Sequence, residues 1–123
     1  MSVSFRFGNT ADFRSDSDKV VTIPSSIVDR DALFSVYVKR LGLPDYFGGN
    51  WDAFSECLRD LSWVGEKRVV IVHEDVPQME ASVLSIYVDV LRECVLDWEP
   101  DEEHELVVVF PKGTVDLVEL RKV

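Results

Sequence analysis

Three carboxylates in the segment LGLPDYFGGNWDAFSECLRDL (residues 41–61) have a spacing that suits the binding of a cationic group. Asp52, Glu56 and Asp60 stand at i, i+4 and i+8, so in a helix they lie on or beside one face. Like charges at this spacing repel each other by roughly a few tenths of a kcal/mol per pair. A cationic partner would offset that repulsion, because carboxylates can take the place of phosphates in a site built for a nucleic-acid backbone.

Two interpretations of these acids follow from the residues. In the first, the acids belong to an ordinary solvated helix face, where Asp52 favours the helix dipole and Glu56 pairs with Arg59. In the second, they mimic phosphates and occupy a cationic active site, with Tyr46 and Trp51 supplying rigid contact area beside the charges. The residues by themselves leave both interpretations open.

The residues before the acids predict a turn followed by the start of a helix. Gly48 and Gly49 permit a tight turn, and Asn50 is the expected N-cap. Phe47 and Trp51 flank the helix start, so they are candidates for the core as well as for a binding surface. This arrangement would place any contact residues of the turn directly beside the acids.

The helix after Asn50 is expected to end near Leu61 or Ser62, and it has two distinct sides at about 100° per residue. The core side is predicted to hold Ala53, Phe54, Cys57, Leu58 and Leu61. The opposite side holds Asp52, Ser55, Glu56 and Arg59, with Asp60 on the flank.

Three short apolar runs predict the strands of a parallel sheet: KVVTI from residue 19, RVVIVH from residue 68 and ELVVVF from residue 105. They do not alternate polar with apolar residues, and continuous β-branched runs are typical of strands covered on both faces. The run VSFRF near the start predicts a further edge strand, and the tail after Phe110 predicts a short strand or helix.

Helical patterns connect these runs. The first helix is expected to begin at Asp29 or Asp31 and to end at Gly42. Its apolar stripe is predicted to contain Ala32, Leu33, Val36 and Leu41. The pattern MEASVLSIYVDVLRECVLDW predicts a helix of about five turns, which Pro100 ends, and DWEPDEEHE is expected to be an acidic solvated loop.

The composition narrows the classes of function. The 123 residues form one domain, and 23 acidic against 13 basic side chains give a net charge of -10. This charge opposes direct binding to nucleic acid and favours a cationic partner. Cys57 and Cys94 lie in apolar helical patterns, which suits a reduced, cytoplasmic protein better than a zinc site or a disulfide scaffold. Neither a signal peptide nor a membrane-spanning run is recognisable, so no membrane association is expected.

Catalytic and metal-binding functions fit the sequence poorly. His73 and His104 lack the context of a hydrolase or metalloprotease motif, and His73, at the end of an apolar run, is expected to be structural. Carboxylates at i and i+4 without further oxygen ligands make a weak cation site. We therefore expect no enzyme activity, no metal and no cofactor.

The segment LPDYFGGNWDAFSECL resembles the signature of the barstar family, small intracellular inhibitors of secreted bacterial ribonucleases. The similarity runs without gaps from VVTIP to Leu58, and more loosely through the second strand, the long helix and the third strand. It implies an α/β fold with a three-stranded parallel sheet and helices packed on it. The single domain would span residues 1–123, with its core near residues 19–110.

The resemblance also implies which residues contact the ribonuclease. Matching family positions are Tyr46, Gly48, Asn50 and Asp52. Glu56 stands where the deepest-reaching acid is usually an aspartate, and Asp89 on the long helix matches a third, outlying acid. Phe47, Gly49 and Ser55 replace a tyrosine, an acid and a tryptophan. The predicted partner-binding residues are Tyr46, Phe47, Gly48, Gly49, Asn50, Trp51, Asp52, Ser55, Glu56 and Asp89.

The resemblance therefore predicts a cytoplasmic inhibitor, an immunity protein that blocks the cationic active site of a bacterial ribonuclease toxin. The alternative is an acidic adaptor module that binds a basic protein other than a nuclease. Loss of a ribonuclease activity on mixing would separate the two.

Overall fold

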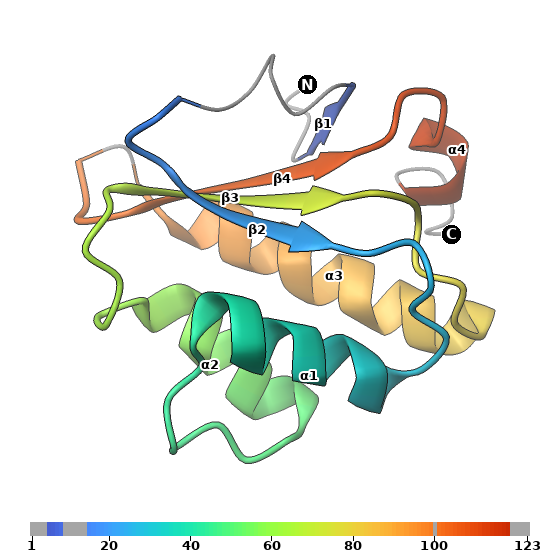
Figure 1. Ribbon diagram of the computed structural model, residues 1–123, viewed down its shortest axis with the longest axis horizontal. Helices are drawn as coiled ribbons and strands as arrows, with labels where there is room; N and C mark the ends of the chain where they lie inside the picture. Colours follow the sequence, from blue (N-terminus) through green and yellow to red (C-terminus); the bar gives the residue numbers. More distant parts are fainter. Residues whose placement is uncertain (1–4, 9–14, 100, 119–123) are drawn as a thin grey trace.

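Four parallel strands form one sheet in the computed structural model (Figure 1), which describes residues 5–8, 15–99 and 101–118. The strands are β1 (Arg6–Phe7), β2 (Lys19–Ile23), β3 (Arg68–His73) and β4 (Glu105–Phe110), in the order β1-β4-β3-β2. In the register, Val70 of β3 lies beside Val20 of β2 and Val107 of β4. The parallel arrangement predicted from the apolar runs is confirmed.

Both faces of the sheet are apolar, as the unbroken β-branched runs predicted. Val69 and Ile71 of β3 are fully buried on the face that the helices cover. Val70 and Val72 point to the other face, where they form a second buried cluster with Val107 and Val109. Because successive side chains of a strand point to opposite faces, a run with two buried faces cannot show polar alternation.

The predicted edge strand is present as β1, which pairs with β4 at one side of the sheet. Phe5, just before β1, is 1 % exposed, and the Phe7 ring stacks on Phe110 with the centroids 6.2 Å apart. Residues 3 and 4 of the predicted VSFRF run lie outside the described residues. At the other end of the chain, a turn with Gly113 at φ 86° leads into the short helix α4 (Val115–Val118).

Three longer helices lie together on one face of the sheet: α1 (Arg30–Leu41), α2 (Trp51–Asp60) and α3 (Ala81–Asp97) (Figure 1). The α1 N-cap is Asp29, and α1 ends at Gly42, whose φ of 74° suits a glycine. α3 ends three residues before Pro100, the predicted helix breaker, which lies outside the described residues. No helix of the described segments has the length and apolar character needed to cross a membrane.

The buried side of α1 is wider than the predicted aliphatic stripe. Phe34 and Tyr37 are buried as well as Leu33, while Ala32 and Val36 are only half-buried. The aromatic rings point toward α2, where the Phe54 ring lies 5.3 Å from Phe34 and 4.8 Å from Tyr37, between ring centroids. Aromatic packing between helices therefore sets the rotation of α1.

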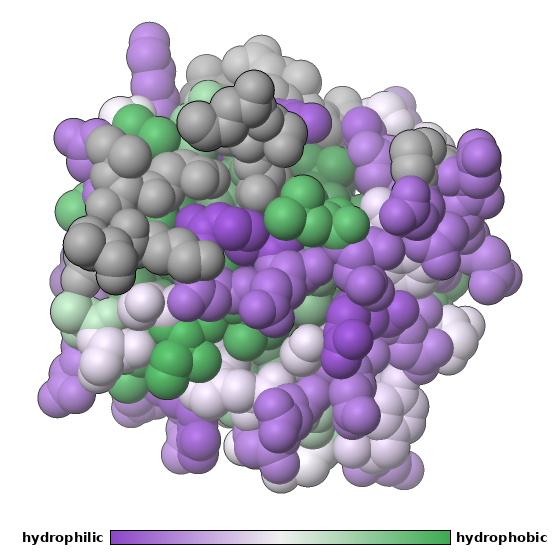
Figure 2. Space-filling view, turned by 180° about the vertical axis from the view of Figure 1, so that it is seen from behind, coloured by the Kyte–Doolittle hydropathy of each residue, from purple (hydrophilic) through white to green (hydrophobic). Residues whose placement is uncertain are grey.

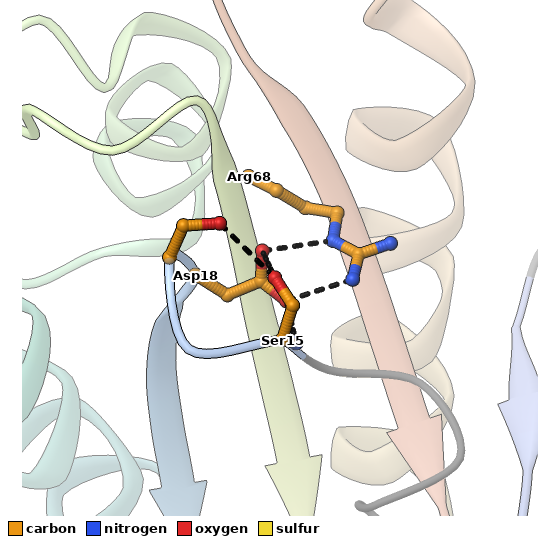
Figure 3. A network of polar contacts seen from close by, with 4 residues as sticks. Ser15, Asp18 and Arg68 are labelled. Carbon is orange, nitrogen blue, oxygen red and sulfur yellow. Dashed lines mark hydrogen bonds and ion pairs between the residues drawn. The ribbon is translucent and has the colours of Figure 1, made fainter.

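An ion pair holds the starting ends of β2 and β3 together (Figure 3). Arg68 donates from Nε and one terminal nitrogen to the two carboxylate oxygens of Asp18, at 3.1 and 2.8 Å. The Ser15 backbone N–H donates to the same carboxylate at 2.7 Å. The bond from Arg68, opposed by burial of the carboxylate, lowers the pKa of Asp18 below its ordinary value.

The surface is mostly hydrophilic on the side opposite to that of Figure 1 (Figure 2). Hydrophobic residues appear there as separate patches between polar side chains. Scattered apolar residues are normal on a protein surface, so charged and polar groups dominate what a partner would meet on this side.

Candidate partner-binding face

The N-terminal turn of α2 and the loop before it are fixed by one glycine and one cap. Gly49 has φ 78°, a conformation that favours glycine, whereas a Cβ on Gly48 would make only an ordinary contact with Asn50 Nδ2, at 3.7 Å. The Asn50 side chain accepts a hydrogen bond from the Ala53 backbone N–H at 2.8 Å. The predicted cap is confirmed, and the tight turn depends on Gly49 rather than on both glycines.

The core side of α2 is buried as predicted. Phe54, Cys57 and Leu58 are fully buried, and the Trp98 indole N–H donates to the Leu58 carbonyl oxygen at 2.9 Å. Because this side is anchored in the core, the opposite side of α2 must face outward. Asp52 and Glu56 are accordingly exposed.

Four carboxylates gather on this outward side, and we call them the acidic face: Asp52, Glu56, Asp60 and Glu93. Asp52, Glu56 and Glu93 line one hollow of about 380 Å³ together with Ser55 and Arg59. A neighbouring hollow is lined by Tyr46, Glu56, Arg59 and Asp60. Glu56 borders both hollows, so it occupies the centre of the face.

The Glu56–Arg59 pair that forms part of the solvated-face interpretation is not present in the structure. Within the described residues, no ion pair of 4 Å or less joins Arg59 to a carboxylate. Its Nε instead donates a long hydrogen bond to the Ser55 carbonyl oxygen, at 3.4 Å. Pairing within the helix therefore does not account for the acids of α2.

Tyr46 is the exposed aromatic residue of the loop, at 54 % exposure. Its hydroxyl donates to the Asp60 carboxylate, and its ring meets Trp63 edge-on with the centroids 6.5 Å apart. Partial desolvation of the phenol and its bond to Asp60 raise the pKa of Tyr46. The Trp63 N–H donates to the Leu41 carbonyl oxygen at 2.9 Å, so Tyr46 is held against an anchored ring.

Phe47 and Trp51, also predicted as partner-binding residues, are half-buried. Their rings both meet Phe34 of α1 edge-on, each with the centroids 5.0 Å apart. Trp51 also lies beside Tyr87 of α3, at 6.2 Å between centroids. These two residues therefore join the loop and α2 to the core and offer a partner only part of their surface.

Ser55 and Asp89, two more of the predicted partner-binding residues, have side-chain contacts within the domain. Ser55 is half-buried, with its hydroxyl 3.7 Å from the Cys94 sulfur. Asp89 accepts a bond from Arg92 at 2.9 Å, and the Arg92 guanidinium carbon lies 5.4 Å from the centre of the Phe5 ring. Asp89 lines neither of the two hollows of the acidic face.

Glu93 is a member of the acidic face that sequence reasoning missed. It follows Asp89 by four residues and so shares its outward side of α3. Which of the two lies beside the acids of α2 depends on where along α3 the two helices meet. That position is visible only from the contacts of Cys94 with Ser55 and of Tyr87 with Trp51.

A chain of buried hydrogen bonds lies beneath the start of α2. The Tyr37 and Tyr87 hydroxyls are 2.6 Å apart, and the Tyr87 hydroxyl lies 2.7 Å from His73 Nε2. His73 Nδ1 lies 3.0 Å from the Val109 carbonyl oxygen, which can only accept, so Nδ1 carries the proton and Nε2 accepts from Tyr87. Burial lowers the pKa of His73 to about 4. The histidine is therefore neutral and part of the core.

The described residues contain no cluster of three or more His, Cys, Asp or Glu side chains arranged to hold a metal ion. The two thiols, Cys57 and Cys94, are free and buried. What the acidic face offers is an array of carboxylates beside one ordered tyrosine. Such an array can bind cationic side chains through charge-assisted hydrogen bonds.

A comparison with protein families matches residues 19–111 to the family described as Barstar (barnase inhibitor). The chain belongs to the barstar family. The match runs from the first residue of β2 to just past β4, and includes α2 and the whole acidic face. Barstar-family members are inhibitors and not enzymes. Searches of curated proteins and of solved structures found no match to this chain.

The barstar-family match leaves β1 and α4 outside its range. β1 pairs with β4, the carbonyl oxygen of Val118 in α4 accepts from Arg92 at 3.5 Å, and both elements lie apart from α2 in Figure 1. They extend the family fold on the side of the molecule that does not carry the acids of α2.

Proposed function

We propose that this protein is a cytoplasmic inhibitor of a bacterial ribonuclease, an immunity protein that blocks the enzyme's active site with its acidic face. The observation that supports this most is the central position of Glu56, exposed between two hollows and in no ion pair with the rest of the described chain. Membership of the barstar family supplies the class of partner.

The mechanism is steric and electrostatic. A ribonuclease must hold the phosphates of RNA, so its cleft presents cationic and hydrogen-bond-donating groups. Asp52 and Glu56 would occupy positions that phosphates otherwise take, while Tyr46 covers the rim of the cleft. The protein performs no chemistry in this mechanism, because filling the cleft is sufficient to exclude RNA.

The proposal is tested by capture and inhibition. The tagged chain, incubated with extract of its own cells, is expected to retain a ribonuclease and to abolish its activity as the two approach equal concentration. An adaptor module would retain a basic protein without inhibiting any ribonuclease. Retention without inhibition would therefore contradict the proposal and favour the adaptor.

Association with that ribonuclease is expected to depend strongly on salt. Opposite charges steer the encounter of two proteins, and the barnase–barstar pair is itself a standard example of this rule. Because the chain carries a net charge of -10, raising the ionic strength should slow association much more than it speeds dissociation. Stopped-flow measurement of both rates would show this, and an association rate independent of salt would argue against the acidic face as the contact surface.

A further inference from the structure

Arg59 is a cation set in the middle of the acidic face. It is exposed and lines both hollows, the one with Asp52 and Glu93 and the one with Tyr46 and Asp60. Its one hydrogen bond within the described chain is the 3.4 Å bond from Nε to the Ser55 carbonyl oxygen, which is long for such a bond. Within the described residues, the terminal nitrogens of its guanidinium form no hydrogen bond or ion pair, so they remain available to a partner that covers the face.

Two other arginines, Arg68 and Arg92, form ion pairs within the domain. Arg68 binds Asp18 through two hydrogen bonds, and Arg92 binds Asp89 at 2.9 Å. Arg59 has four carboxylates around it and forms an ion pair of 4 Å or less with none of them. The surrounding acids keep the guanidinium on this face by longer-range attraction, without consuming its hydrogen-bonding capacity.

A partner with a uniformly cationic cleft would meet Glu56 favourably and Arg59 unfavourably, because like charges brought together in an interface oppose binding. The conflict is removed if the cleft also holds an anionic side chain opposite Arg59. Cleavage of RNA by an attacking hydroxyl requires a general base, and a carboxylate is one of the side chains that fill this role. A carboxylate inside a cationic cleft is thus compatible with the partner's chemistry.

We propose that Arg59 is a specificity-determining residue that binds a carboxylate in the otherwise cationic cleft of the partner ribonuclease. This inference rests on the proposed function and deepens it. Arg59 selects enzymes whose cleft contains an Asp or Glu between its cationic groups, and it disfavours enzymes whose cleft is cationic throughout. The guanidinium can bind a carboxylate through two parallel hydrogen bonds, a geometry that a lysine cannot reproduce.

The test asks whether removal of the Arg59 side chain weakens inhibition or strengthens it. Inhibition constants are measured for wild type, Arg59→Ala and Lys39→Ala against the ribonuclease that the wild-type chain retains from its own cell extract. Lys39 is exposed on α1, outside both hollows, and its removal changes the net charge equally. We expect Arg59→Ala to raise the inhibition constant by roughly 10- to 100-fold relative to Lys39→Ala. An inhibition constant equal to or below that of Lys39→Ala would overturn the inference.

Glu56→Gln separates this inference from the proposed function. If Glu56→Gln weakens inhibition while Arg59→Ala does not, the acidic face is still the inhibitory surface, but Arg59 does not bind the enzyme. If the wild type inhibits no ribonuclease, both fall together. Thermal melting of each variant verifies that it is folded.

A double-mutant cycle distinguishes a direct contact from a merely structural role. Each Asp or Glu of the ribonuclease cleft is replaced by its amide, and the effect of Arg59→Ala is measured again as a change in the dissociation constant by calorimetry, because an enzyme without its general base has no activity to inhibit. At one position the effect should disappear, because the carboxylate that Arg59 binds is already gone. A structural role for Arg59 would leave its effect the same against every enzyme variant, and that result would refute the contact.

Discussion

Asp60, at the end of α2, orders the side chain of Tyr46 on the proposed partner surface. Asp60 was predicted only to lie on the flank of the helix, yet its carboxylate accepts bonds from the Tyr46 hydroxyl and from the Ser62 hydroxyl, the latter at 3.0 Å. The phenol is thus ordered before any partner binds. Ordering a side chain in advance removes part of the entropic cost of binding.

Replacing Asp60 with Ala should release Tyr46. Loss of the neighbouring carboxylate is expected to lower the pKa of Tyr46, because the bond to Asp60 and its charge are among the causes that raise it. The other two tyrosines, Tyr37 and Tyr87, are buried and also have raised pKa values. Spectrophotometric titration should therefore show one tyrosine ionising at lower pH in the variant.

The same variant should inhibit less well, by roughly 0.5–1.5 kcal/mol of binding free energy, the cost of immobilising one side chain. Asp101→Ala removes the same charge from the exposed loop before β4 and serves as the control. An unchanged tyrosine titration in Asp60→Ala would show that the bond to Asp60 does not order Tyr46 in solution.

At the scale of elements, the strands follow the sequence most closely. The runs KVVTI, RVVIVH and ELVVVF coincide with β2, β3 and β4. Continuous β-branched runs are typical of strands that are buried on both faces. The cap and core side of α2 were also predictable, since Asn50 and the apolar spacing are local signals. A family resemblance then connected this helix to a function.

Features that depend on contacts between elements were not predictable. The burial of Phe34 and Tyr37 depends on the neighbouring rings of α2 and α3, and the approach of Glu93 to α2 depends on where along their lengths α2 and α3 meet. Within the described chain Arg59 forms no ion pair, and this depends on the conformation of its side chain, whose Nε donates to the Ser55 carbonyl oxygen. Spacing along the chain defines the side of a helix but not the neighbours that this side meets.

The contribution of the N-cap of α2 to stability can be measured by substitution of Asn50. Asn50→Ala removes the bond to the Ala53 N–H, and the free energy of unfolding should fall by about 1 kcal/mol. Asn50→Asp retains an acceptor at the cap and should keep most of the stability. Urea denaturation of the three proteins would measure both effects, and an alanine variant as stable as the wild type would show that the cap does not stabilise α2.

The whole molecule combines a surface charge of -10 with a buried neutral histidine. His73 joins β3 to β4 through Val109 and to α3 through Tyr87, so its protonation state affects the packing of the domain as a whole. Asp18, in contrast, is ionised and paired at the other end of β3. The two groups make stability depend on pH in different ranges.

Stability is expected to fall as the pH is lowered from about 6.5 to about 4. Burial lowers the pKa of His73 from 6.5 to about 4, so between these values the unfolded chain binds a proton that the folded chain does not. The loss should reach about 3 kcal/mol. Above pH 6.5 the histidine is neutral in both states and costs nothing, whereas the contribution of Asp18 is lost only at lower pH, as the pH falls through its lowered pKa.

Urea denaturation at a series of pH values would measure this loss, and NMR titration would follow His73 directly in the folded protein. A His73 titration midpoint near its ordinary pKa would contradict the assignment of a neutral, buried imidazole.

The most direct test of the inhibitory face compares Glu56→Gln with wild type in two assays, thermal melting and inhibition of the captured ribonuclease. Because Glu56 has no ion pair within the described chain and lies among other acids, neutralising it should leave the melting temperature equal or slightly higher. The inhibition constant should rise by roughly tenfold or more, since a charged hydrogen bond to the enzyme is lost. Asp101→Asn should change neither. A Glu56→Gln protein that melts at a lower temperature and still inhibits fully would contradict the assignment of this face.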